Sequence, residues 1–168
     1  MDEWWQQVGA TLAAEFSDLP DLAEWTRVTL RLVLAALLGG LLGFERELKG
    51  KAAGVRTHML VAMGAALFVL VPQQLGVPDA DLTRVIQGLV TGIGFLGAGT
   101  IIKGRDEDQV QGLTTAAGIW LTAAIGVAAG YGREATAVLS ALLAFVILWA
   151  VPRLLDALGV KDDHGSSS

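Results

Sequence analysis

The sequence predicts an all-α integral membrane protein, a bundle of about five transmembrane helices. The 168-residue chain is 53% hydrophobic and only 17% charged. Soluble domains carry about 25% charged residues, so the polar surface is too small for a soluble globule of this length. Five stretches also approach the roughly 20 apolar residues that a helix needs to cross a bilayer.

The five predicted spans follow one another with short loops between them. They cover residues 26–44, 57–75, 84–102, 113–131 and 135–151. The third and fourth are the clearest, because no charged side chain occurs between Val85 and Ile102 or between Gln109 and Gly132. We therefore expect one transmembrane domain over residues 26–152 and a short cytoplasmic tail over 153–168.

Residues 1–25 form a separate acidic segment without Lys or Arg. Aromatic and aliphatic side chains recur in it at helical spacing: Trp4, Trp5, Val8, Leu12 and Phe16. This pattern predicts a short amphipathic helix that lies on the outer surface of the membrane.

Basic side chains are concentrated in alternate loops, and this bias orients the bundle. One side carries Arg46, Lys49, Lys51, Arg56, Lys103, Arg105, Arg153 and Lys161. The short loops of the other side carry only Arg84 and Arg133, with Arg27 at the mouth of the first span. Because basic loops stay in the cytoplasm, we expect the N-terminus outside and the C-terminus cytoplasmic.

Small and polar residues fall on stripes that predict the packing faces of the helices, since close backbone approach holds membrane helices together. The first stripe is Ala36, Gly40 and Gly43, and the fourth span carries Thr115, Gly118, Thr122, Gly126 and Ala129. The third span places Arg84, Gln87, Gly88, Thr91 and Ala98 in one sector and aliphatic residues opposite. We expect that small and polar sector to face protein or water and the aliphatic sector to face lipid.

The glycine run Gly94, Gly97 and Gly99 has two interpretations. Ordinary helix packing is favoured, and a helix break that lines an ion or substrate site is the alternative. Arg31 and Arg84 lie near the outer side of the membrane. Three roles are open for them: their side chains extend to the membrane–water interface, they pair with Glu24, Asp79 or Asp81, or they take part directly in function.

Glu45, Arg46 and Glu47 close the first span, and His58 opens the second. Glu45, Arg46 and Glu47 form either an interfacial salt-bridge cluster or a group in which the two glutamates face the bundle and handle a cation or proton. His58 is either a satisfied interfacial donor or a side chain that exchanges a proton near neutral pH. Glu47 lies on the small-residue stripe and is expected to point inward, whereas Glu45 lies nearer the Arg31 face.

Several classes of function are excluded or disfavoured by composition. The absence of cysteine excludes disulfides and thiolate metal sites. Two histidines cannot form a histidine-rich metal cluster, and a net charge of −5 gives no footprint for nucleic acid. No nucleotide-binding or metal-ligand motif occurs, so we expect no enzyme activity and no cofactor.

Three strings, in order, resemble the MgtC/SapB family of bacterial inner-membrane proteins over about residues 27–150. They are Leu38–Glu47 followed by Gly54–His58, then Thr91–Ile101, then Gly112–Gly126. By resemblance, the family-motif positions are Glu45, Arg46, Glu47, Arg56, Thr57, His58, Gly94, Gly97, Gly99, Gly112, Thr114 and Thr115.

The resemblance implies a five-span inner-membrane protein linked to magnesium homeostasis, acid tolerance and virulence. The family's best-known member is described as restraining the ATP synthase, although labels of magnesium transport persist. Two departures are visible. Many members carry an ACT-like cytoplasmic domain, which we do not expect here, and Gln111 with the acidic loop 105–108 replaces a more basic pattern.

Two functions remain open from the sequence. The first is a non-catalytic regulator in the lipid bilayer that binds another membrane protein or a second copy of itself. The alternative is a small oligomeric transporter or channel for Mg²⁺ or another cation.

Overall fold

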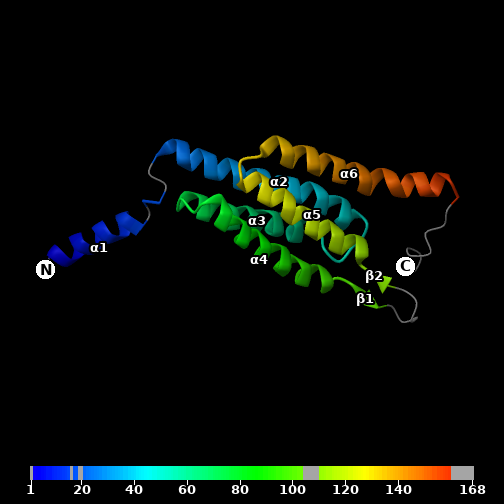
Figure 1. Ribbon diagram of the computed structural model, residues 1–168, viewed down its shortest axis with the longest axis horizontal. Coiled ribbons are helices and arrows are strands. Elements are labelled where there is room, and N and C mark those ends of the chain that lie inside the picture. Colours follow the sequence, from blue (N-terminus) through cyan, green and yellow to red (C-terminus); the bar gives the residue numbers. More distant parts are fainter. Residues whose placement is uncertain (1, 16, 19–20, 104–109, 160–168) are drawn as a thin grey trace. The chain divides into compact units, whose positions relative to one another are not determined.

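The computed structural model describes residues 2–15, 17–18, 21–103 and 110–159 (Figure 1). The described secondary structure consists of six helices and one short hairpin whose two strands have two residues each. The chain divides into two compact units, residues 1–30 and residues 31–168. The acidic loop 105–108 and the tail beyond residue 159 lie outside the described residues.

The first unit contains α1 (Asp2–Glu15) and the start of α2 (Leu22–Leu48). The predicted N-terminal helix is confirmed, and the Trp4 and Trp5 rings stack with centroids 3.8 Å apart. The Asp21 carboxylate begins α2 by accepting the backbone N–H of Glu24 at 2.7 Å, as residues at helix N-caps commonly do. Arg27 and Glu24 form an exposed ion pair one turn apart.

The second unit contains the remainder of α2 and four further long helices, joined in one place by the antiparallel strands β1 (Ile102–Lys103) and β2 (Val110–Gln111). The helices are α3 (Val55–Gln74), α4 (Asp79–Ala98), α5 (Leu113–Gly130) and α6 (Glu134–Ala157). The all-α membrane fold is therefore confirmed, and each predicted span corresponds to one helix. In the described residues α2, α3, α5 and α6 are long and apolar enough to cross a membrane. The 20-residue α4 is as long as α3 but more polar, and it falls outside that group.

Small side chains form the core of the second unit. Alanines dominate it, with Leu38, Leu42 and Ile125 as the large members; the alanines are Ala35, Ala62, Ala66, Ala129, Ala137, Ala141 and Ala144. Because these side chains are short, α2, α3, α5 and α6 approach closely, as is usual for membrane helices that associate through packing.

Glycines set the closest approaches between helices. A Cβ at Gly39 would lie 2.5 Å from the His58 carbonyl oxygen, so α2 and α3 touch backbone to backbone. On α5, Gly126 and Gly130 meet the backbones of Ala62 and Ala66 in the same way. Sequence positions rise together along α3 and α5, so these two helices run parallel. The predicted stripe on the fourth span is thereby confirmed as a packing face.

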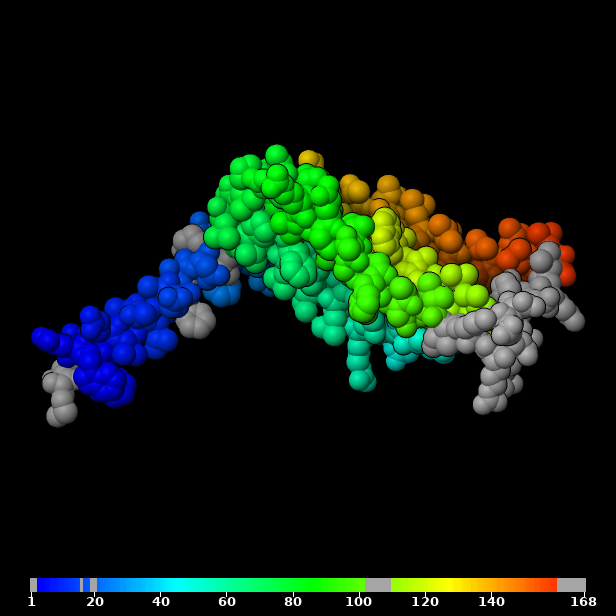
Figure 2. Space-filling view, turned by 60° about the horizontal axis from the view of Figure 1, so that its bottom comes forward, coloured from blue at the N-terminus to red at the C-terminus, as the bar shows by residue number. Residues whose placement is uncertain are grey.

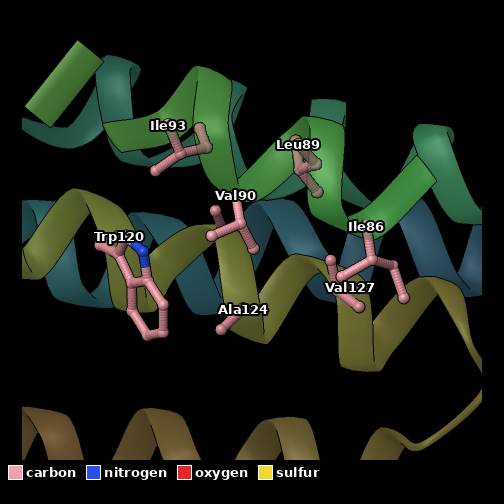
Figure 3. Close-up of a pocket in the computed structure, with 8 residues that line it drawn as sticks. Ile86, Leu89, Val90, Ile93, Trp120, Ala124 and Val127 are labelled. Atoms are coloured by element: carbon pink, nitrogen blue, oxygen red, sulfur yellow. The ribbon is translucent and has the colours of Figure 1, made fainter. Parts of the chain in front are cut away.

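The α4 helix packs with the opposite face from the one predicted. Its aliphatic residues Ile86, Leu89 and Ile93 lie against α5 (Figure 3). Gln87, Gly88 and Thr91, on the other side of the helix, are exposed. The prediction that the aliphatic sector faces lipid is therefore wrong for Ile86, Leu89 and Ile93. The small and polar sector, expected to face protein or water, has no other described helix against it in the single chain. The reason is that α5 turns Trp120 and Val127 toward α4, and aliphatic side chains match that surface.

Candidate functional site

A buried charged cluster lies at the end of the second unit where α2 ends and α3 begins. Glu45 and Arg46 are almost completely buried and form an ion pair with each other through the Arg46 Nε and Nη2 atoms. Lys49 Nζ lies 2.7 Å from the other Glu45 oxygen and donates to the Leu148 carbonyl of α6 at 3.1 Å. The Glu45 carboxylate thus contacts both Arg46 and Lys49, and the Lys49 side chain links α2 to α6.

Glu47 has a different role from the one predicted. Its side chain is exposed, and its Oε2 accepts the backbone N–H of Val55 at 2.8 Å, at the first residue of α3. A Cβ at Gly54 would meet that same oxygen, so a larger residue there would require the flexible Glu47 side chain to shift. The expectation that Glu47 rather than Glu45 points inward is wrong: Glu47 caps the N-terminus of α3, where a negative charge is favourable, and Glu45 is the buried carboxylate.

His58 is fully buried between three helices. Its backbone carbonyl faces Gly39 of α2, and its Nε2 lies 3.5 Å from the Cβ position of Gly118 on α5. Nδ1 lies 2.9 Å from the Gly54 carbonyl oxygen. Because a carbonyl only accepts, Nδ1 carries the proton and donates, which leaves Nε2 as an acceptor in the neutral ring. Nε2 has no hydrogen-bond partner in the described residues.

Two threonines continue this buried polar line along α5. Thr115 and Thr122 are both buried, and they lie on the same helix face as Gly118. Thr122 falls between Gly118, which meets His58, and Gly126, which meets Ala62. Its Oγ1 also lacks a hydrogen-bond partner in the described residues. We call His58, Thr115 and Thr122 the polar seam; it places two unpartnered polar atoms on the interface of α3 and α5.

Arg31 binds the opposite end of the second unit. Its Nη1 donates to the Gly130 carbonyl at 3.0 Å and to Gln73 Oε1 at 3.4 Å, and its Nε lies 3.6 Å from Glu134. Arg31 therefore joins α2 to the ends of α3 and α5 and to the start of α6. Pairing is one of the alternatives that the sequence leaves open, but the partners expected for it, Glu24, Asp79 and Asp81, are wrong for Arg31, since the acidic residue in contact is Glu134.

The glycine motif residues differ in what the structure requires of them. The α4 helix continues through Gly94 and Gly97 and ends at Ala98, so the run does not interrupt it. A Cβ at Gly97 would lie at an ordinary contact distance of 3.6 Å from Ala116 of α5, and a Cβ at Gly94 would meet nothing within 4 Å among the described residues, so neither position needs glycine for space. Gly112 begins α5 with a φ of +91°, and a Cβ there would lie 2.0 Å from the Thr100 carbonyl oxygen. Both its conformation and its contact require glycine.

The remaining predicted site residues are dispersed. Arg56 and Thr114 are exposed at the beginnings of α3 and α5, Thr57 next to Arg56 is half-buried, and Gly99 follows α4. Arg84 is exposed in the second turn of α4. The structure thus brings Glu45, Arg46 and His58 to one end of the bundle and leaves Arg31 and Arg84 apart from them.

Sequence reasoning missed two members of the site. Lys49 follows Glu45 by four residues, which is the spacing of a helical ion pair. Thr122 was placed on the fourth-span stripe but not among the site residues, although its hydroxyl at mid-helix was a signal. A cation site of three or more His, Cys, Asp or Glu residues does not occur within the described ranges.

Together, these features define a multi-spanning helical membrane protein with a buried charged cluster at one end of a glycine-packed bundle. The chain belongs to the MgtC family, whose model matches residues 32–157. The resemblance drawn from the three sequence strings is confirmed. No solved structure matches the chain.

Several curated proteins are similar to this chain. YhiD of Escherichia coli K12, whose name suggests magnesium transport, is 41% identical over 80% of this chain and 65% of its own length. SrpB of Synechococcus elongatus is 45% identical over 65% of this chain and 66% of its own. MgtC of Brucella abortus is 48% identical over 74% of this chain and 49% of its own. The chain spans about half to two thirds of the length of these relatives.

Proposed function

We propose that this chain is a non-catalytic regulator in the bacterial inner membrane. It takes part in adaptation to low magnesium or acid, as the MgtC resemblance implies, and acts by binding a membrane partner such as the ATP synthase. Its N-terminus lies outside and the basic loops lie in the cytoplasm, following the charge bias of the sequence.

The observation that carries this proposal is that three glutamates at the two ends of the bundle, Glu45, Glu47 and Glu134, already have partners within the chain. Glu45 meets Arg46 and Lys49, Glu47 accepts from the α3 backbone, and Glu134 lies beside Arg31. Mg²⁺ binds proteins through one or two carboxylates and retained water. It would have to displace these internal partners, so the geometry favours charges that shape the bundle over charges that carry an ion.

We place the contact surface for this partner at the end of the bundle where α3 and α5 begin. Arg56 and Thr114 are exposed there, and both belong to the family motifs. An exposed guanidinium can form bidentate bonds with a carboxylate of another protein. We assign the regulatory contact to this surface.

The experiment is ATP-driven proton pumping in inverted membrane vesicles, with and without the chain. We expect the chain to lower the pumping rate, and Arg56→Ala to recover at least half of the loss. Arg133→Ala is the matched control, since Arg133 is an exposed arginine at the opposite end of α5, in the turn before α6. Pumping that is unaffected by the chain, or equally affected by both variants, contradicts the proposal.

The alternative function is a small oligomeric transporter for Mg²⁺ or another cation. The observation in its favour is that two buried atoms of the polar seam, His58 Nε2 and Thr122 Oγ1, have no hydrogen-bond partner among the residues that the structure describes. The name of YhiD points in the same direction. This alternative predicts cation flux by the purified protein alone, and that flux would be lost in His58→Gln and in Thr122→Val.

A further inference from the structure

One face of α4 has no cover in the described part of the second unit. It consists of residues that recur at helical spacing and are all exposed: Arg84, Gln87, Gly88, Thr91 and Gly92. We call these residues the α4 glycine face. Figure 2 shows α4 on the near side of the molecule with no other described helix over it. The opposite face of α4 is already occupied, because its aliphatic side chains line an apolar cavity of about 250 Å³ against α5 (Figure 3).

The glycines of this face differ from the packing glycines elsewhere. Gly39, Gly126 and Gly130 each have opposing backbone within 3 Å of the position that a Cβ would take, whereas Gly88 and Gly92 have nothing within 4 Å. In membrane helices, glycines four residues apart form a flat strip on which a second helix can cross closely. Among the described residues of this chain, no helix uses that strip.

Lipid is a poor cover for the same face. The Gln87 side chain makes no hydrogen bond within the described residues, and Arg84 has no ion-pair partner there. Polar groups in a bilayer usually face other protein, where they find partners. The polarity of α4 also sets it apart from the four helices that are apolar enough to cross a membrane. A protein surface therefore covers this face more favourably than acyl chains do.

The charges of α4 fit a second copy of the chain as that protein surface. Asp81 and Arg84 are both exposed, and they lie one turn apart ahead of Gly88. Copies of one chain share their orientation in the membrane, so two α4 helices meet in parallel around a two-fold axis. In a two-fold interface every contact between two different residues occurs twice, once on each side of the axis. Arg84 can then reach Asp81 of the partner subunit on both sides of the axis, and the two Gln87 amides can bond each other.

We infer that two copies of this chain pair in the membrane through the α4 glycine face, with the helices crossing at Gly88 and Gly92. The inference is independent of the regulatory proposal, because that proposal concerns Arg56 and Thr114 on other helices. A dimer also leaves the end of the bundle where α3 and α5 begin free for another protein.

Single-cysteine cross-linking in membrane vesicles tests the pairing directly, and the chain has no native cysteine to interfere. We expect Gln87→Cys and Thr91→Cys, after mild copper-catalysed oxidation, to give a product of twice the 17.6 kDa chain mass. Val146→Cys is the control, because Val146 is exposed near the middle of α6. The α4 variants should cross-link at least tenfold more than this control.

A second pair of variants tests the crossing point. Gly88→Leu and Gly92→Leu, each combined with Thr91→Cys, should reduce the dimer product at least tenfold. Gly64→Leu should not, although Gly64 also meets nothing within 4 Å in its own chain. Equal cross-linking at Thr91 and Val146, a product of another mass, or a dimer that survives both leucines would each overturn the inference. Proton pumping in the same vesicles separates this result from a failure of the regulatory proposal.

Discussion

Replacing Gly126 by alanine tests how tightly α5 packs on α3. The added methyl carbon would lie 2.2 Å from the Ala62 carbonyl oxygen and 2.8 Å from its carbonyl carbon. Ordinary contacts begin near 3.4 Å. Both atoms belong to the backbone, so no side chain can rotate away, and the two helices must separate by about 1 Å. Separation at this position also disturbs the alanine core around it.

The expected cost follows from overpacking. Inserting a methyl group into a well-packed interior typically costs about 1–3 kcal/mol, a large part of a total stability of about 5–15 kcal/mol. Gly64→Ala is the matched control on α3, because its Cβ would meet nothing within 4 Å. There the same substitution should be neutral or stabilise by up to about 1 kcal/mol, since alanine favours the helix.

Thermal unfolding of the purified protein in detergent, followed by tryptophan fluorescence, measures the difference. Gly126→Ala should lower the Tm by about 2–12 °C, given roughly 2–4 °C per kcal/mol for a chain of this size. Gly64→Ala should leave the Tm unchanged or raise it slightly. If both variants unfold at the same temperature, the close backbone contact between α3 and α5 does not exist, and the parallel packing derived from it is refuted.

Three further predictions use the same unfolding assay. Arg31→Ala removes a hydrogen bond from a charged group to the end of α5 and should lower the free energy of unfolding by about 1–3 kcal/mol. Glu134→Gln changes the more exposed member of the ion pair and should lower it by less than about 1 kcal/mol. Equal losses in the two variants would contradict the contacts described for Arg31. Arg46→Leu leaves the buried Glu45 carboxylate without its nearest cation and should lower the free energy of unfolding by about 3–5 kcal/mol. Lys49→Ala should lower it clearly less, because the Lys49 side chain is partly exposed. Gly112→Ala should destabilise by more than about 1 kcal/mol because of its positive φ, and an unchanged Tm would refute the tight start of α5.

Much of the fold could be predicted from the sequence, because membrane helices are long and apolar for a simple physical reason. All backbone groups must be hydrogen-bonded within the helix, and this produces recognisable apolar runs. The stripe of Thr115, Gly118 and Thr122 also showed its packing role, since small residues leave room for an opposing backbone. The helix ends were less certain: α2 and α6 extend beyond the apolar runs into polar sequence.

Other features could not be read from one sequence. The face of α4 was assigned by polarity, but its neighbour within the chain is the aliphatic surface of α5, and the small residues face outward. Glu45 and Glu47 are two residues apart on one helix, and only the position of α3 decides which carboxylate is buried. The partner of Arg31 lies 103 positions further along the chain, at Glu134, and pairings over that distance depend on the complete topology.

Ion flux through the purified protein in liposomes tests the central claim most directly. Trapped dyes would report Mg²⁺ and protons under opposed gradients, with the fold and orientation of the inserted protein verified separately. If the protein is a regulator whose charged side chains are paired within the chain, the flux should not exceed that of empty liposomes. Flux well above that level, lost in Thr122→Val and retained in Gly64→Ala, would contradict the account and make the polar seam a transport path.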